Sequence, residues 1–150
     1  MKAGLKTKFF DYHQNNTGGK FHFNDLAGIT RLVVIEALNA IHANAIAESI
    51  GLYWNGCEAG RDCSCCGDRW HEASRGDGDP VPSEYGSSLH NREPSRALFK
   101  GKQSKGEACV HYLDGTLEWF NDGVSEFDNK ASDSYDPLRN TKWKVDTNED

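Results

Sequence analysis

Long apolar runs are absent from this sequence of 150 residues. A membrane-spanning helix needs about 18 or more consecutive apolar residues, and no segment approaches that length. The segment Met1 to Phe10 carries charges and lacks the apolar core of a secretory signal peptide. We therefore expect a soluble, cytoplasmic protein with no membrane contact. The length is typical of one domain that builds its own hydrophobic core.

Sequence motifs of several enzyme classes are missing as well. The chain has no phosphate-binding Gly-Lys-Ser/Thr loop, no nucleophile elbow and no paired-histidine helix of a zinc protease. The zinc deaminase pattern is also absent. One weak signal is His90-Asn91, which follows a cysteine-rich segment as in HNH nucleases. A metal-dependent hydrolase that uses His71 and His90 is therefore a third-ranked hypothesis.

An excess of basic charge is also lacking. The 17 Lys and Arg residues against 23 Asp and Glu residues give a net charge of −6. Nucleic-acid binding usually needs a basic face, so direct binding of nucleic acid is not expected. The acidity increases along the chain, and residues 121–150 hold eight acids and four bases. We expect one domain over residues 1–120, followed by an acidic, largely irregular tail over 121–150.

Strand patterns are present in the first third of the chain. Residues 6–13 contain three aromatic side chains, and Asn15 to Gly19 has the composition of a turn. Phe21 and Phe23 alternate with polar residues, which predicts a second short strand. The β-branched run within Ile29 to Ala37 predicts a third strand.

A helix is predicted after these strands. Asn39 is suited to cap the helix N-terminus, apolar residues continue to Ile50, and Gly51 is suited to end the helix. Residues 72–96 are rich in Gly, Ser, Asp and Pro and are expected to form a loop. Residues 107–120 alternate around Asp114-Gly115, which predicts a hairpin with a type I′ turn. Together these elements predict an α+β fold, with five or six mainly antiparallel strands packed on one principal helix.

A cluster of cysteines is the strongest chemical signal. Cys57, Cys63, Cys65 and Cys66 fall within ten positions, and Cys63 to Gly67 has the spacing of a zinc knuckle. We predict a structural Zn²⁺ held by a loop over residues 52–71. The fourth ligand is open between Cys65 and His71, because the side chains of adjacent residues diverge. Four thiolates would leave no open coordination position, which favours a structural role over a catalytic one.

The sequence gives less support to two other uses of the cysteines, a disulfide and a redox dithiol. A disulfide requires an oxidising compartment, and no secretory signal is present. A redox dithiol normally begins a helix after a strand, whereas Gly56, Gly60 and Gly67 flank this cluster. The fifth cysteine, Cys109, lies among apolar residues and is expected to be a core thiol.

Three segments resemble a family of small zinc-binding proteins of tailed bacteriophages, whose chemistry is unknown. They are FFDYHQNNTGG at 9–19, AGITRLVVIEA at 27–37 and IGLYWNGCEAGRDCSCCGDRW at 50–70. Small acidic phage proteins often inhibit host defence. The size and the predicted metal are also similar to those of anti-CRISPR inhibitors of the type II RNA-guided nuclease. The resemblance implies a non-enzymatic protein that acts in the bacterial host cytoplasm by binding a host defence protein.

Acidic surface residues would complement the basic channel of such a nuclease. The candidate partner contacts are Asp68, Arg69, Trp70, Asp77, Asp79, Glu84, Asp122, Glu126 and Asp128. The three residues Asp68, Arg69 and Trp70 could equally fold back on the metal loop as structural groups. The second-ranked hypothesis is a zinc-ribbon-like nucleic-acid adaptor. It would use Arg61, Arg69, Arg75, Arg92 and Arg96, with Trp54 and Trp70 as stacking platforms.

Overall fold

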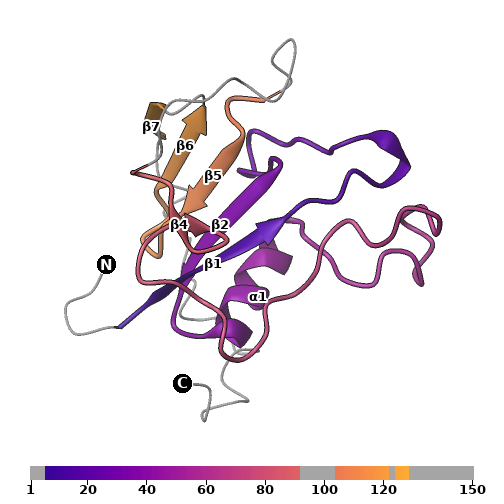
Figure 1. The fold of residues 1–150 in the computed structure, drawn as a ribbon, viewed down its shortest axis with the longest axis horizontal. Helices are drawn as coiled ribbons and strands as arrows, with labels where there is room; N and C mark the ends of the chain where they lie inside the picture. The colour runs from indigo at the N-terminus through magenta and orange to yellow at the C-terminus, as the bar shows by residue number, and fades with distance from the viewer. Residues whose placement is uncertain (1–5, 92–103, 122–123, 129–150) are drawn as a thin grey trace.

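A mixed five-stranded sheet packed against one helix forms the body of the protein, which is an α+β fold (Figure 1). The computed structural model describes residues 6–91, 104–121 and 124–128. The strands of this sheet, in spatial order, are β1 (Lys8–His13), β2 (Leu32–Ala37), β5 (Ala108–His111), β6 (Leu117–Asn121) and β7 (Val124–Asp128). A smaller sheet pairs β3 (Ser83–Glu84) with β4 (Ser87–Ser88). The helices are the 3-10 turn η1 (Thr17–Gly19) and α1 (Ala40–Ile50).

Strand β2 is buried on both faces. Val33 and Ile35 belong to the core cluster that contains α1, and Leu32 and Val34 belong to a second cluster with Val110 and Phe120. A strand covered on both faces is expected to be almost continuously apolar, as this one is. The exception, Glu36, is buried, and its carboxylate accepts hydrogen bonds from the Thr7 hydroxyl at 2.6 Å and from the Leu113 N–H at 2.8 Å.

The predicted helix and both of its ends are confirmed. Helix α1 begins after Asn39, whose side-chain oxygen accepts a hydrogen bond from the His42 N–H at 2.8 Å. At the other end Gly51 adopts φ 122°, a backbone conformation that residues other than glycine rarely adopt. Its N–H bonds to the Glu48 carbonyl, and that of Leu52 bonds to the Ala47 carbonyl. This pattern is a Schellman cap, and it turns the chain out of the helix.

The sheet contains one parallel pair. β2 runs parallel to β5, whereas β1–β2, β5–β6 and β6–β7 are antiparallel. The parallel pair requires a long connection, which carries α1 and the cysteine-rich segment. β7 lies after residue 120, within the segment that the sequence analysis assigned to the tail.

Two local predictions were wrong. Phe21 and Phe23 form no strand, and their rings instead lie 6.3 Å apart, beside an isolated bridge between Asn24 and Ile29. The β5–β6 connection is not a two-residue type I′ turn, because Gly115 has positive φ and Asp114 does not. The Tyr112 N–H bonds to the Thr116 carbonyl, which closes a three-residue loop instead.

A glycine in the 24–29 turn allows close contact with β5. Gly28 has φ 73°, and a Cβ on it would lie 2.6 Å from the imidazole of His111. The Gly28 carbonyl accepts a hydrogen bond from His111 Nε2 at 2.8 Å. Burial lowers the pKa of His111 to about 4, although this hydrogen bond opposes the shift. His111 is therefore neutral in the folded protein at neutral pH. Nearby Cys109 is a buried core thiol, as predicted.

Acid should destabilise the protein through His111. Its pKa is about 4 when folded and 6.5 when unfolded, so the unfolded chain binds the proton first. Stability is lost progressively as the pH falls from 6.5 toward 4, and the loss levels off below pH 4. From pH 7 to pH 5 this loss is about 2 kcal/mol. Urea unfolding at both pH values should show a correspondingly flatter pH dependence for His111→Gln. The control His22→Gln should change the slope less, because burial and Arg69 lower the pKa of His22 but the residue stays exposed. An unchanged slope in His111→Gln would refute the assignment.

Candidate metal centre

The four clustered cysteines lie on an irregular extension of the chain. We call residues 55–69 the Cys lobe; it extends to the right of the sheet and helix in Figure 1, beside the segment that follows β1. Its only apolar side chain other than those of the cysteines is that of Ala59. Fixing each residue of such a loop costs about 1 to 2 kcal/mol of conformational entropy, so contacts other than apolar packing must order it.

A tight turn at Cys63 to Gly67 has the features of a knuckle. The N–H groups of Cys66 and Gly67 both bond to the Cys63 carbonyl at 3.1 Å, and Gly67 adopts φ 94°. Hydrogen bonding from the Cys66 thiol and from the N–H groups of Cys65 and Cys66 lowers the pKa of the Cys63 thiol. The Cys57 sulfur lies 3.3 Å from the Cys63 carbonyl oxygen. The turn therefore orients backbone donors toward a thiolate and holds Cys57 alongside.

Side chains from the segment after β1 attach the turn to the body. The Thr17 hydroxyl accepts a hydrogen bond from the Cys63 N–H at 2.9 Å, and the Asn15 amide donates to the carbonyls of Cys66 and Asp68 at 2.7 and 3.2 Å. Within the lobe, the Asp68 carboxylate accepts from the Cys57 N–H at 2.9 Å. Asp68 therefore has a structural role next to the cysteines.

A buried arginine joins the lobe to the same segment. Arg69 is 3% exposed, and its guanidinium donates to the Gln14 side-chain oxygen at 2.9 Å and to the carbonyls of Lys20 and Thr17 at 2.8 and 3.2 Å. Its Nε lies 3.8 Å from the carboxylate of Asp62, whose side chain is fully buried. Asp62 also accepts from the Tyr53 hydroxyl at 2.7 Å. Arg69 thus fastens the Cys lobe to the segment after β1.

The side chains of Arg69 and Trp70 are both buried, which favours the structural alternative for these residues over a recognition surface. Trp70 is 2% exposed and belongs to the core cluster with α1. The sequence signal was ambiguous because a charged or aromatic residue beside a cysteine turn can face either way. The roles of Gln14 and Asp62 at Arg69 were not identified from the sequence. Gln14 bonds Arg69 across 55 residues, and Asp62, although near in sequence, meets Arg69 only because the irregular lobe folds back on itself.

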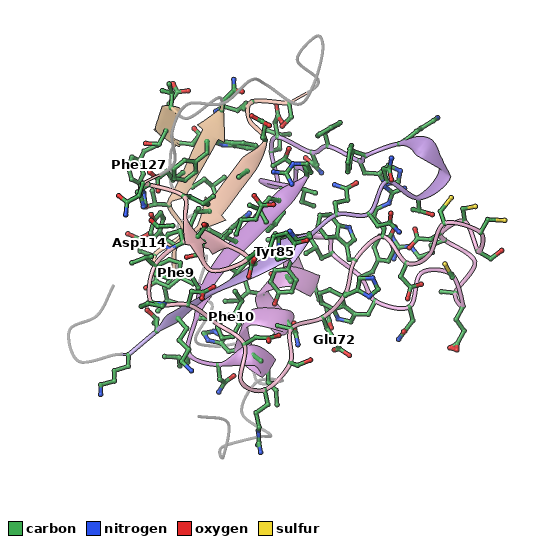
Figure 2. All side chains as sticks on the ribbon, viewed as in Figure 1. Phe9, Phe10, Glu72, Tyr85, Asp114 and Phe127 are labelled. Carbon is green, nitrogen blue, oxygen red and sulfur yellow. The ribbon has the colours of Figure 1, made fainter. Side chains whose placement is uncertain are left out.

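The thiols are near one another but not arranged as a ligand set. Sulfur atoms gather at the outer end of the Cys lobe in Figure 2. Among the described residues, no group of three or more His, Cys, Asp or Glu side chains is placed to hold a metal ion. Cys65, Cys66 and His71 are exposed, whereas Cys57 and Cys63 are half-buried. The donors fit zinc by chemistry and by the turn that carries them, and metal binding would require their side chains to rotate inward.

The acidic candidates are scattered over the structure. Asp77 and Glu126 are exposed, and Asp79 is half-buried near β1. Glu84 is paired with Arg31 at 3.1 Å, and Asp128 with Lys105 at 2.5 Å. Asp122 lies outside the described residues. The structure therefore does not unite these residues in one acidic patch, and only some of them are accessible to a partner.

The groups of the other two hypotheses are also separated. Trp54 stacks on Tyr12 and donates to Glu48, and Arg61 lies 3.6 Å above the ring of Tyr53. With Trp70 buried, the predicted pair of stacking platforms does not form. Arg75 is exposed, while Arg92 and Arg96 lie outside the described residues.

His90 is bound to the sheet rather than to the Cys lobe. Its Nε2 lies 3.0 Å from both carboxylate oxygens of Glu118 on β6, a residue that is 1% exposed. His71 is instead an exposed residue that follows the lobe. The two histidines thus belong to different structural environments, which does not favour a shared hydrolytic centre.

Comparison with known proteins gives a family but no activity. No helix in the described part of the chain has the length and apolar character needed to cross a membrane. No curated protein and no solved structure matches the chain. A family model described as a domain of unknown function (DUF7296) matches residues 7–130, which include the sheet, α1 and the Cys lobe. The chain therefore belongs to the DUF7296 family.

Proposed function

We propose that this protein is a non-enzymatic, zinc-stabilised binding domain that inhibits a host defence protein. The observation that carries the metal part is the Cys63–Gly67 turn. The N–H groups of Cys66 and Gly67 bond to the Cys63 carbonyl, and those of Cys65 and Cys66 favour the Cys63 thiolate by lowering its pKa. Such donors stabilise a thiolate before the metal arrives. Cys57, Cys63 and Cys66 would hold the ion, together with Cys65 or His71. When bound, zinc would supply the cross-links that the lobe's few apolar side chains cannot.

The inhibitor role is supported by charge and by resemblance. The net charge of −6 favours association with a basic partner through electrostatic steering. The three segments similar to tailed-bacteriophage proteins favour a bacterial defence protein as that partner, and the type II RNA-guided nuclease presents positively charged channels. Exposed Asp77 and Glu126 are the remaining acidic candidates for direct contact. The protein would act in the host cytoplasm.

Elemental analysis tests the metal site. We expect one zinc per chain in protein purified under reducing conditions, and loss of zinc in Cys63→Ser. Comparison of Cys65→Ser with His71→Ala should identify the fourth ligand, because only the true ligand's variant loses affinity by 10-fold or more. Cys109→Ala is the matched control: it removes a thiol outside the lobe and should retain zinc. Wild-type protein without zinc would contradict the proposal.

The inhibitor role needs a separate measurement. Reconstituted type II nuclease should retain the protein in a pull-down at low salt, and the complex should weaken as salt rises because screening reduces the charge attraction. Absence of a complex even at low salt would remove this partner while leaving the zinc assignment intact.

A further inference from the structure

A cavity away from the cysteines brings together aromatic and acidic groups from three segments. Its volume is about 390 Å³, and it lies between β1, the 73–79 segment and the β3–β4 turn. Phe10 and Tyr85, both labelled in Figure 2, line it together with Asp11, Asp77 and Asp79. Ligand sites are commonly concave and combine apolar walls with a few convergent polar groups. This cavity has both.

Tyr85 presents an aromatic ring at the mouth of this cavity. Its ring stacks on His13 with centroids 4.1 Å apart and planes inclined by 15°, yet the residue is 83% exposed. Its N–H donates to Asp11 at 3.2 Å. One face of the ring is therefore held by His13, while most of the side chain faces solvent. A rigid, exposed tyrosine is a frequent anchor in protein interfaces.

The position of Tyr85 is conformationally costly. Tyr85 and Gly86 form the two-residue β3–β4 turn with φ values of 51° and 82°. A type I′ turn requires this positive φ at both positions, and asparagine or glycine fits there better than an aromatic residue. The chain thus carries a tyrosine where local structure favours a smaller side chain. Replacing Tyr85 with asparagine should therefore not destabilise the turn, so a loss of binding in that variant would report on the aromatic ring.

The charges around the cavity favour a cation. Although burial opposes it, the hydrogen bonds from His13 to Asp11 and Glu84 raise the pKa of His13 to about 9. His13 and Arg31 therefore balance Asp11 and Glu84. Asp79 faces a different environment: burial first, and then the like charges of Asp11 and Asp77, raise the pKa of its carboxyl. A cation at this point would relieve that repulsion.

We propose that the cavity binds the guanidinium group of an arginine side chain on a partner protein. The negative charge at Asp77 and Asp79 selects a cation. The open face of Tyr85 selects a planar one, because a guanidinium stacks on an aromatic ring and bonds a carboxylate through two parallel N–H groups. An ammonium group can use the charge but not the planar stacking. The arginine site itself is argued from the cavity. Only the identity of the partner protein that carries the arginine rests on the proposed function.

Calorimetric titration of the zinc-loaded full chain at low salt tests this. The probes are blocked Gly-Arg-Gly, its lysine counterpart and its citrulline counterpart, which keeps the shape of arginine without the charge. We expect the arginine peptide to bind most tightly. Asp79→Asn should weaken it about 10-fold through loss of a charge-assisted hydrogen bond. Tyr85→Asn should weaken it about 2- to 5-fold, with a melting temperature equal to or above that of the wild type.

The control Asp114→Asn makes the same exchange in the exposed β5–β6 loop and should leave peptide affinity unchanged. Equal binding of citrulline, tighter binding of lysine, or equal weakening by Asp114→Asn would each overturn the arginine site. No peptide binding, in protein that still holds zinc and captures the nuclease, would overturn this inference alone. Peptide binding without nuclease capture would overturn the proposed partner alone.

Discussion

Removing zinc under reducing conditions should lower the melting temperature by about 10 °C or more. Binding at a structural zinc site releases on the order of 10 kcal/mol, and even a third of that exceeds the contribution of most single contacts. For a domain of this size, each 1 kcal/mol of lost stability lowers the melting temperature by about 2 to 4 °C. Calorimetric melting of chelated and zinc-loaded protein measures the difference directly.

Hydrogen exchange would locate the effect. We expect amides of the Cys lobe to lose protection in metal-free protein, whereas those of β2, which is buried on both faces, stay protected. Cys109→Ala should retain the zinc-dependent shift, because its thiol is in the core. Identical melting with and without metal would show that the lobe is ordered by its hydrogen bonds alone.

Replacing Arg69 with methionine should destabilise the fold by about 3 to 5 kcal/mol. Methionine fills much of the same volume but leaves the buried Asp62 carboxylate without a cation. It also leaves the carbonyls of Lys20 and Thr17 without the guanidinium donor and removes one of the two hydrogen bonds to the Gln14 side-chain oxygen. Removal of one partner from a buried charge pair typically costs this amount. Urea unfolding gives the free energy.

Arg61→Met is the matched control, since Arg61 lies in the same lobe but is exposed, with its guanidinium 3.6 Å above the Tyr53 ring. An exposed cation–π contact contributes about 0.5 to 1 kcal/mol, so this variant should lose little. Adding Asp62→Asn to Arg69→Met should recover part of the loss by removing the unpaired charge. Equal effects of the two arginine substitutions would contradict the role of Arg69.

Local chemistry made parts of the fold predictable. Asn39 and Gly51 mark the ends of α1 because each satisfies backbone groups within a few residues, and such signals need no tertiary contact. The strand predicted at Phe21 and Phe23 does not form, because an alternation of two apolar residues with polar ones is too short to specify a strand when no neighbouring strand pairs with it. The parallel β2–β5 pair joins Leu32 to Ala108. Nothing near either residue in the sequence indicates that contact.

The same division applies to the candidate site. The cysteine spacing predicted a turn at Cys63–Gly67, and that turn is present. The orientation of Arg69 and Trp70 could not be predicted, because it depends on Gln14, Thr17 and the core beneath α1. Tyr85 was also missed: a Tyr-Gly pair in a Ser- and Pro-containing loop resembles ordinary surface sequence, and only the tertiary fold places its ring on His13.

The parallel pair also affects how the chain is made. Leu32 leaves the site of synthesis 76 positions before Ala108, and at about 5 to 20 residues per second β5 follows β2 by about 4 to 15 s. Throughout that interval β2 can pair only with β1 and pack only against α1, so its second edge stays open. The Cys lobe emerges during this delay, while the open edge of β2 remains a template for misassociation.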